Sequence, residues 1–546
     1  SSDLGLMQLV AYGAQDVYLT GNPQITFWKV TYRRHTNFAM ESIEQTFNGQ
    51  ADFGRRVQCT ISRNGDLAYR TYLQVTLPEI GQENCCNDKG DSIYARWLDY
   101  PGEQLISMVE VEIGGQRIDR QYGDWMHIWN QLTLTSEQER GYNKMVGQTT
   151  QLTYLIDPSF ANVQSACSDG SAPAAVCAPR NALPETTLYV PLQLWFCRNP
   201  GLALPLIALQ YHEVRINLEL RALDECLFAV NSMSKNDDSV TKDSASFSKS
   251  LVSASLYVDY VFLDTDERRR MAQNPHEYLI EQLQFTGAES VGSSSNKIKL
   301  NFNHPCKELI WVVQRDDVVD YCKSMQGGTT LNALLGAQPF NYTDTYDALT
   351  NSIASFSGPK AVRGTNAFIA SGLFQDPGAG NWVGATASGS AYDWGSSASS
   401  SLSVPFPVEA GDVDSGVSDA GAFVLAETAL SLHCWGENPV VTAKLQLNGQ
   451  DRFSEREGSY FDLVQPFQHH TRSPDTGINV YSFALRPEEH QPSGTCNMSR
   501  IDNATLQLVL SSETVMAERT AKVRVYATNY NVLRVMSGMG GLSYSN

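Results

Sequence analysis

The sequence lacks an apolar run that is long enough to cross a bilayer as a helix. Its longest apolar stretch, residues 202–209, is interrupted by Pro205, whereas a spanning helix needs about 20 apolar residues. The opening residues Ser1, Ser2 and Asp3 precede only a short mixed stretch without the pattern of a secretory leader. We therefore expect neither a membrane-spanning segment nor a leader peptide.

Positive charge is scarce as well. The chain has 40 Lys and Arg against 59 Asp and Glu, which gives a formal net charge of −19. Proteins that coat nucleic acid neutralise its phosphates with Lys and Arg. The basic clusters present, at residues 33–34 and 268–270, are short and fit a solvated or salt-bridged surface. Direct contact with nucleic acid is therefore not expected.

Catalytic motifs are missing too. No GxSxG, HExxH or GxxxxGK[ST] pattern occurs. His469 and His470 are adjacent, so on a strand their side chains would point to opposite faces rather than share a metal ion. Glu110 and Glu112 would share a strand face, which we interpret as the solvent face. The sequence thus predicts no catalytic residues, no metal site and no cofactor.

The 11 cysteines are scattered, with no CxxC pair, and their odd number leaves at least one unpaired. Free, partly buried thiols of an intracellular protein are the simplest interpretation. Cys167 and Cys177 flank one loop, and a disulfide between them stays open.

Strand-like segments are what the chain does contain. Four segments alternate between apolar and polar residues with period two, at 109–113 (VEVEI), 214–220 (VRINLEL), 297–302 (KIKLNF) and 505–510 (TLQLVL). A more apolar segment at 256–263 (LYVDYVFL) is expected to be buried on both faces. The best helix candidates are short, at 124–132 and 265–272. This pattern predicts an all-β protein.

One strand-and-turn pattern occurs twice, which suggests a duplicated β domain. Residues 113–125 read IGGQRIDRQYGDW, and residues 447–460 read LNGQDRFSEREGSY. In each half an aromatic-rich segment follows, at 191–196 and 480–485, and then a strand at 214–220 or 500–510. Further aromatic-rich strands close the halves at 256–263 and 523–530. Three correspondences in the same order indicate two copies of one β domain.

Two segments of biased composition interrupt this pattern. Residues 231–249 are rich in Ser, Asp and Lys, and residues 327–419 are rich in Gly, Ala and Ser. Both are typical of solvent-facing loops on a rigid scaffold. Because the longer insertion contains Trp382, Tyr392 and Trp394, we expect it to be partly folded over the body.

Motifs along the whole chain resemble a known family. The N-terminal run 9–28 (LVAYGAQDVYLTGNPQITFW) resembles the N-terminal signature of the major capsid proteins of nucleocytoplasmic large DNA viruses, especially those of algal viruses. The resemblance continues at 62–67 (SRNGDL), 112–119 (EIGGQRID), 199–214 (NPGLALPLIALQYHEV), 258–263 (VDYVFL), 275–287 (PHEYLIEQLQFTG), 301–305 (NFNHP), 447–453 (LNGQDRF), 491–506 (QPSGTCNMSRIDNATL) and 530–542 (YNVLRVMSGMGGL). It departs mainly in loops, around 80–100, 133–186, 223–250 and 320–440.

The resemblance implies an all-β chain with two tandem eight-stranded antiparallel jelly rolls, long loop insertions and short helices. We expect an N-terminal arm at 1–24, a first jelly roll at 25–265, a linker at 266–277 and a second jelly roll at 278–546 with the insertion at about 327–419.

The resemblance also implies a structural, non-enzymatic protein of the outer shell of a virion, assembled in the cytoplasm of the infected host. Three chains would form a pseudo-hexameric capsomer that tiles an icosahedral shell. Its partners would be other copies of itself, neighbouring capsomers, minor capsid proteins beneath the shell and the inner viral membrane, but not nucleic acid.

Two sets of residues are candidates for further roles. Leu6, Met7, Leu9 and Val10 would anchor the arm, which we expect to be extended and broken by turns rather than helical. The arm either packs on its own jelly roll or contacts partners beneath the capsomer. Asn341, in an N-x-S/T triplet within a variable loop, is the better candidate for glycosylation than Asn497 or Asn503.

Two other functions are weighed against the capsid. A carbohydrate-binding or host-attachment protein of the virion would use aromatic residues of the 327–419 insertion to stack on sugars, and this role is compatible with a capsid. A jelly-roll enzyme is the third possible function. Such an enzyme would bind its metal through histidines at alternating strand positions together with a carboxylate, and none of the nine His has that spacing. Tryptophans 28, 125, 129, 195, 311 and 435, with Phe27, are interpreted as core or interface anchors.

Overall fold

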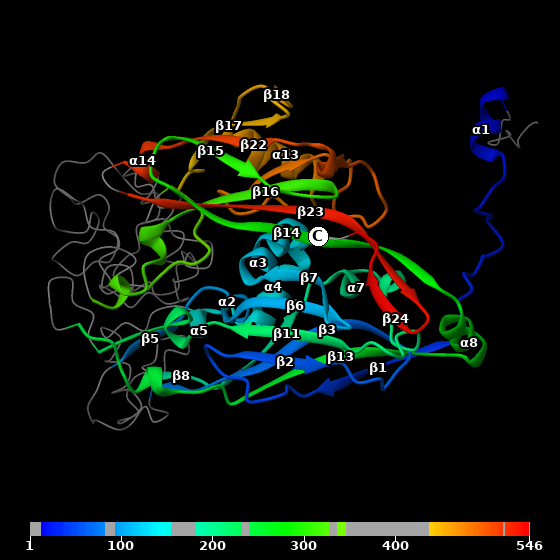
Figure 1. Ribbon diagram of the computed structural model, residues 1–546, viewed down its shortest axis with the longest axis horizontal. Helices are drawn as coiled ribbons and strands as arrows, with labels where there is room; N and C mark the ends of the chain where they lie inside the picture. The colour runs from blue at the N-terminus through cyan, green and yellow to red at the C-terminus, as the bar shows by residue number, and fades with distance from the viewer. Residues whose placement is uncertain are drawn as a thin grey trace, which may run out of the picture.

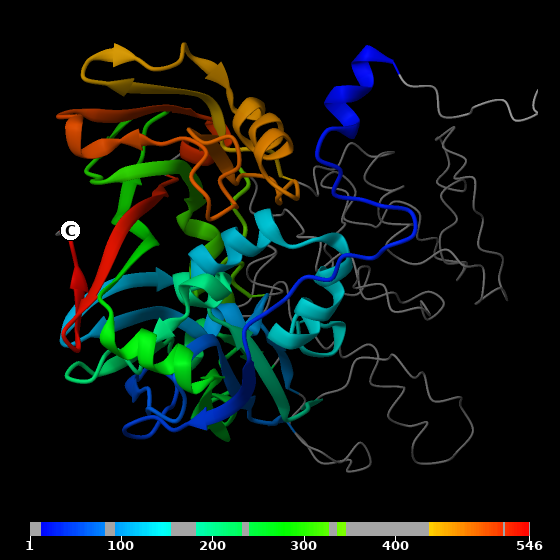
Figure 2. The ribbon, with the colours of Figure 1, turned by 90° about the vertical axis from the view of Figure 1, so that its right-hand side faces the viewer.

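The computed structural model describes residues 13–81, 93–153, 182–231, 240–326, 336–344, 436–516 and 519–544. Two β bodies lie one above the other in Figures 1 and 2, the N-terminal half below and the C-terminal half above, with helices between them.

The lower body consists of two antiparallel sheets. One sheet has the order β1-β13-β3 with β9 and β10 pairing along β3, and the other has the order β2-β11-β6-β7. The bounds are β1 Phe38–Gln45, β2 Arg56–Thr60, β3 Leu67–Leu77, β6 Ile106–Ile113, β7 Gln116–Tyr122, β9 Thr186–Pro191, β10 Leu204–Pro205, β11 Val214–Leu220 and β13 Ser253–Leu263. Two short pairs accompany them, β4 Ile80–Gly81 with β8 Ala182–Leu183 and β5 Tyr94–Trp97 with β12 Leu227–Val230.

The upper body repeats this arrangement. Its sheets have the orders β14-β23-β16-β20 and β15-β22-β17-β18. The bounds are β14 His276–Val291, β15 Ser295–Leu300, β16 Pro305–Arg315, β17 Val440–Leu447, β18 Gln450–Asp451, β19 Arg456–Glu457, β20 Asn479–Ser482, β21 Cys496–Asn497, β22 Ala504–Leu510, β23 Ala521–Met536 and β24 Met539–Leu542.

Strand by strand in chain order, the two bodies have the same topology. Counted over the eight main strands of each body, the first, eighth, third and sixth form one sheet, and the second, seventh, fourth and fifth form the other. This is the jelly-roll arrangement, so the chain is a double jelly roll. The repeated turns are equivalent hairpins: Ile113 pairs with Gln116 and Leu447 with Gln450. The prediction of a duplicated β domain is confirmed by this shared order.

Each roll has its own hydrophobic core between its sheets. Leu73, Val109 and Ile216 belong to the first core, and Leu309, Trp311 and Leu506 belong to the second. The four alternating segments predicted from the sequence fall on β6, β11, β15 and β22, although β15 ends at Leu300 and leaves the last two residues of 297–302 outside the strand. The segment 256–263 lies in β13, but its side chains alternate between buried and half-buried positions, so the expectation of burial on both faces is wrong.

Helices occur mainly in connections. The two predicted helices are present as α3 Gly123–Thr133 and α8 Thr265–Gln273. The segment 191–196 is not a continuous strand, because β9 ends at Pro191 and α7 begins at Trp195. The remaining bounds are α2 Pro101–Leu105, α4 Ser136–Val146, α5 Thr150–Thr153, α7 Trp195–Arg198, η8 Tyr460–Val464 (a π-helical turn), α13 Gln465–His469 and α14 Ser512–Val515, with 3₁₀ turns at η1 Ala14–Asp16, η3 Pro200–Leu202, η4 Leu223–Glu225, η5 Ser246–Ser248, η6 Asp316–Val319, η7 Lys323–Met325 and η9 Met498–Arg500.

The N-terminal segment leaves the body and projects from one end of the molecule (Figures 1 and 2). The arm was expected to be extended, but a short helix forms at η1 and α1 Val17–Thr20. The Asp16 carboxylate accepts the Gly13 N–H at 2.6 Å, which caps this turn. The helix ends at Gly21, whose N–H donates to the Val17 carbonyl at 3.0 Å.

Candidate functional site

The seam between the two rolls is built around α3. Trp125, Ile128, Trp129 and Leu132 recur at helical spacing and therefore form one apolar stripe. That stripe packs on the outer face of the upper roll, against Ile310, Val312, Val480 and Tyr526. In Figure 2 α3 lies between the rolls. Burial of two tryptophans makes this contact a large contributor to holding the rolls together.

A network of ion pairs joins the two rolls next to α7. Glu281 of β14 contacts Arg198 at 3.2 Å, Lys307 at 2.8 Å and His490 at 3.3 Å. Burial alone would raise the pKa of Glu281, but the charge of Arg198 and the hydrogen bonds from His490 and Lys307 lower that pKa to about 2. A carboxylate that is so well paired stays ionised and links the two rolls at any physiological pH.

Hydrogen bonds between side chains and the backbone add to this network where β7 meets β14. The Asp119 carboxylate accepts the Leu283 N–H at 3.1 Å, and the Gln282 side chain donates to the Ile118 carbonyl. Complete burial raises the pKa of Asp119 to about 6 despite its hydrogen bonds. Glu110, expected on a solvent face, is instead buried and ion-paired with Arg120. The pair forms because β6 and β7 place Glu110 and Arg120 opposite each other.

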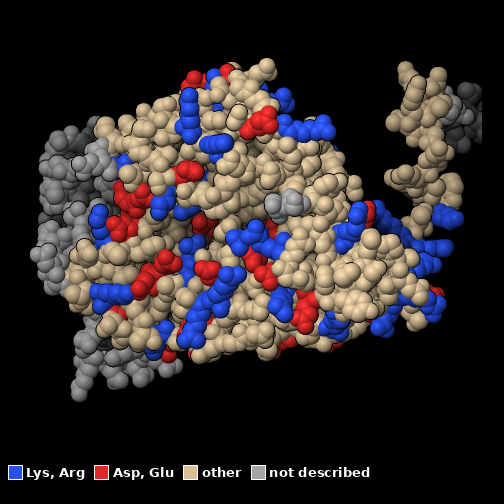
Figure 3. Space-filling model, viewed as in Figure 1, with Lys and Arg blue, Asp and Glu red and all other residues tan. Residues whose placement is uncertain are grey.

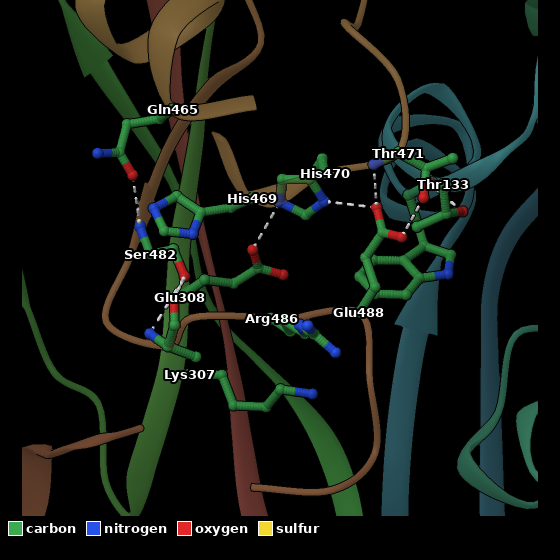
Figure 4. Close-up of polar contacts among 12 residues, drawn as sticks. Thr133, Lys307, Glu308, Gln465, His469, His470, Thr471, Ser482, Arg486 and Glu488 are labelled. Carbon is green, nitrogen blue, oxygen red and sulfur yellow. Dashed lines mark hydrogen bonds and ion pairs between the residues drawn. The ribbon is translucent and has the colours of Figure 1, made fainter. Parts of the chain in front are cut away.

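The buried side chain of His470 holds helix α13 of the upper roll in place. His470 follows α13, its Nε2 lies 2.9 Å from Glu308 Oε2, and its Nδ1 lies 2.9 Å from Glu488 Oε1 (Figure 4). Burial would lower the pKa of His470, but the charge of Glu308 and the hydrogen bonds to both carboxylates raise it to about 9. A protonated His470 between two carboxylates therefore holds the end of α13 against β16.

The same loop also reaches the helices of the first roll. The Arg472 guanidinium contacts Glu139 of α4 at 2.7 Å, and the Arg472 N–H donates to the Leu132 carbonyl at 3.2 Å. The adjacent His469 turns elsewhere, with its Nδ1 at 3.1 Å from the Leu485 carbonyl (Figure 4). Two neighbouring histidines thus serve different local contacts, and no cluster of metal-binding side chains occurs among the described residues.

The predicted arm anchors Leu6, Met7, Leu9 and Val10 lie outside the described residues. The described residues of the arm are mostly exposed, and so are Phe27 and Trp28 just after it, which were expected to be core or interface anchors. Within the fold itself, neither side chain contributes to a core. Trp125, Trp129, Trp195 and Trp311 are buried as predicted, and Trp435 lies outside the described part.

Asn341 lies in a buried turn between the rolls. Its side chain is 2% exposed, and its Nδ2 donates to Gln338 Oε1 at 2.7 Å. Because a glycan would be attached at this same nitrogen, modification would have to precede folding of the turn. Residues 336–344 pack on the body, with Phe340 against Tyr100 and His127. The other parts of the 327–419 insertion, with Trp382, Tyr392 and Trp394, lie outside the described residues.

The surface charge has no continuous basic track on the face shown in Figure 3, where basic and acidic side chains are interspersed. Of the basic cluster at 268–270, Arg268 pairs with Asp66 at 3.0 Å. Six cysteines in the described part are free thiols: Cys59, Cys197, Cys226, Cys306, Cys322 and Cys496. Cys167 and Cys177 lie outside it. No described helix is long and apolar enough to span a membrane.

Sequence reasoning missed the ion network and the His470 site. Glu281, Lys307 and His490 are far apart in the sequence and carry no shared motif. The spacing of Trp125, Ile128, Trp129 and Leu132 did carry a signal, because it defines one helix face.

Two family models together match most of the chain. Residues 26–264 match the model described as the major capsid protein N-terminus. Residues 267–541 match the model described as the large eukaryotic DNA virus major capsid protein.

Individual relatives agree over the full length. The chain is 73% identical to the major capsid protein of Phaeocystis pouchetii virus, covering 99% of both chains. It is 69% identical to that of Chrysochromulina ericina virus, covering 99% of this chain and 100% of the relative. Among solved structures, a chain of the PBCV-1 virus capsid matches with a TM-score of 0.59 and 32% identity, covering 95% of this chain and 100% of that one.

Proposed function

This chain belongs to the family of major capsid proteins of large eukaryotic DNA viruses, and we propose that three copies form a pseudo-hexameric capsomer of the icosahedral shell. The family is structural, so the chain is a capsid component of the virion and not an enzyme. Its function resides in surfaces through which it assembles with itself.

The shared strand order of the two rolls supports the homotrimer. One chain presents two bodies of the same topology side by side, so three chains would present six similar bodies around one axis. Such a ring fits hexagonal packing on a flat facet, and closed rings are the usual outcome when the repeated contact has a suitable rotation.

Light scattering of the purified chain tests this proposal. We expect a molar mass of three times the 60.3 kDa chain, with hexagonal outlines in electron micrographs. A chain that stays monomeric at micromolar concentration would contradict the homotrimer.

The domain boundaries remain part of the proposal. We place an arm at 1–24, a first roll at 25–265, a linker at 266–277 and a second roll at 278–546. The helix α8 between β13 and β14, and the limits of the two family matches near residues 264 and 267, support the linker.

We further propose that the arm contacts partners beneath the shell. Tyr18 and Leu19 of the arm are exposed apolar side chains, and so are Ile25, Phe27 and Trp28 just after it. Such a group of side chains is typical of an unfilled contact surface. Minor capsid proteins are the partners we expect, and the inner membrane is the other outcome to test. Leu6, Met7, Leu9 and Val10 would extend this contact.

Deletion of residues 1–20 distinguishes a role of the arm in trimer formation from a role in the assembly of trimers into shells. We expect trimers of unchanged mass that fail to build normal shells, because the arm lies outside both cores. Normal shells from the deleted chain would contradict a role for the arm. Flotation with vesicles that contain anionic lipid, compared between full and deleted chains, distinguishes membrane from protein partners.

Assembly in the host cytoplasm fits the free thiols of the described residues, since disulfides are rare in that compartment. The net charge of −19 supports a shell that does not contact the genome directly. Intact-mass measurement of virion protein decides the remaining prediction of a glycan at Asn341: a mass equal to that of the sequence excludes it.

A further inference from the structure

Each roll places a helical turn at the same point of its fold, after the hairpin of its fourth and fifth strands. In the first roll this turn is α3, and in the second it is η8 with α13. A glycine introduces each. A Cβ on Gly123 would lie 2.1 Å from the carbonyl oxygen of Ile106, and a Cβ on Gly458 would lie 1.8 Å from that of Val440. Ile106 and Val440 are the first residues of the equivalent strands β6 and β17, so the two turns are structurally equivalent.

Counting from these glycines aligns the two turns residue by residue. Met126 corresponds to Phe461, and each is buried in the core of its own roll. The seam residues Ile128, Trp129 and Leu132 then correspond to Leu463, Val464 and Phe467. We call the latter three residues the ridge.

The ridge differs from its counterpart in burial. Ile128, Trp129 and Leu132 are buried against the upper roll, whereas Leu463, Val464 and Phe467 are 57%, 39% and 82% exposed. In Figure 2 the turn that carries the ridge lies at the side of the upper roll, whereas α3 lies between the rolls. Apolar side chains in the position of a known contact, but without a partner among the described residues, indicate a contact that another chain completes.

The upper roll contacts α3 through one face of a sheet, and the equivalent face of the first roll is the surface on which the ridge would dock. Within one chain, α3 covers the outer face of β16, β20 and β23. The equivalent strands of the first roll are β3, β9 and β13.

Their outer face carries Tyr72, Tyr189 and Tyr257, which we call the tyrosine face. Tyr257 is the register partner of Tyr72, as Tyr526 is of Ile310. The Tyr72 and Tyr257 rings stack at 5.2 Å, and Tyr189 lies 6.2 Å from Tyr72.

We propose that the ridge of one copy docks on the tyrosine face of a second copy. This contact would repeat between chains the contact that α3 makes within one chain. It rests on the proposed homotrimer and names the surfaces that form it. Tyrosine is enriched in protein interfaces, because it buries a large ring and keeps a polar end for hydrogen bonding.

The ridge is held in place before any partner arrives. His470 fixes the end of α13 through Glu308 and Glu488. Gln465 accepts the Ser482 N–H at 3.1 Å and donates to the Tyr460 hydroxyl at 2.7 Å. A rigid apolar surface loses little conformational entropy on docking, which favours association.

A charged double variant tests the ridge. We expect Leu463→Asp/Phe467→Asp in the full chain to reduce the mass measured by light scattering from three chains to one, with an unchanged circular dichroism spectrum. Met516→Asp is the control, because Met516 lies in the same roll and is also 57% exposed; this variant should stay trimeric. A monomeric wild type would contradict the homotrimer itself, whereas a trimeric double variant beside a trimeric wild type would contradict only the ridge.

A cysteine pair tests the receiving surface. In a Phe467→Cys/Tyr189→Cys variant, mild oxidation should join copies covalently into trimers on a non-reducing gel, while each single variant should give none beyond the wild-type background. A trimeric double variant without such cross-links would overturn the assignment of the tyrosine face.

Discussion

The two rolls share a topology but have unequal surroundings. The outer face of the upper roll is covered by α3 of its own chain, and the corresponding face of the lower roll carries half-exposed tyrosines. The helical turns show the opposite difference, because α3 is buried and the ridge is exposed. Duplication thus gave one chain two copies of the same pair of surfaces, of which one pair is joined within the chain. The other pair is available for assembly.

Substitution at equivalent positions of the two turns should give the largest contrast. Trp129→Ala should lower the free energy of unfolding by about 3–5 kcal/mol, since it empties a buried site in the seam. Val464→Ala at the equivalent position should cost at most about 0.5 kcal/mol in the dissociated chain, because Val464 is exposed there. Urea unfolding of dilute protein measures both values, and similar losses would show that the two turns are not differently buried.

Removal of the buried histidine tests what holds the ridge. His470→Gln should cost about 3–5 kcal/mol at pH 7, because it leaves a buried Glu308 without its charged partner. His469→Gln, at the neighbouring residue, removes only a contact to the Leu485 carbonyl and should cost about 1 kcal/mol or less.

The pH dependence of His470 follows from its raised pKa. The pKa is about 9 in the folded chain against an ordinary value of 6.5, so the folded state binds the proton more tightly. The stabilisation is fully present below pH 6.5 and is lost as the pH rises through 9. The difference in unfolding free energy between wild type and His470→Gln should therefore shrink from pH 7 to pH 10. A constant difference over that range would show that His470 is not protonated in the fold.

The two hairpins offer a smaller contrast. Gly114 and Gly449 both have positive φ, so alanine at either should cost about 1–2 kcal/mol in backbone strain. A Cβ on Gly114 would also lie 2.4 Å from the His212 ring, whereas none of the described atoms approaches that on Gly449 within 4 Å. In thermal unfolding, the melting temperature of Gly114→Ala should be lower than that of Gly449→Ala. The reverse order would contradict this account of the hairpins.

Local patterns predicted the elements of both rolls well. Alternation identified β6, β11, β15 and β22, and the GGQR and NGQD turns revealed the duplication, because strand pairing and two-residue turns depend on neighbouring residues. The helix candidate at 124–132 coincides with α3. Glu110 shows where local reasoning failed: its burial depends on Arg120 and Asn217, which come from two other strands.

The contacts at the seam could not be predicted, because they join residues that are distant in sequence. The same holds within the upper roll, where His470 after α13 meets Glu308 of β16, which lies 162 residues earlier in the chain. The adjacent pair His469 and His470 suggested separate roles, but nothing nearby in the sequence indicated two carboxylates around one ring. The ridge likewise has the composition of an ordinary core segment, and only the folded structure shows that its side chains are exposed.

A cryo-electron microscopy reconstruction of the purified capsomer tests the central claim most directly. The account predicts a ring of six rolls in which Leu463, Val464 and Phe467 of each copy lie against Tyr72, Tyr189 and Tyr257 of the next. A trimer in which these residues face solvent, with the copies joined through other surfaces, would contradict it.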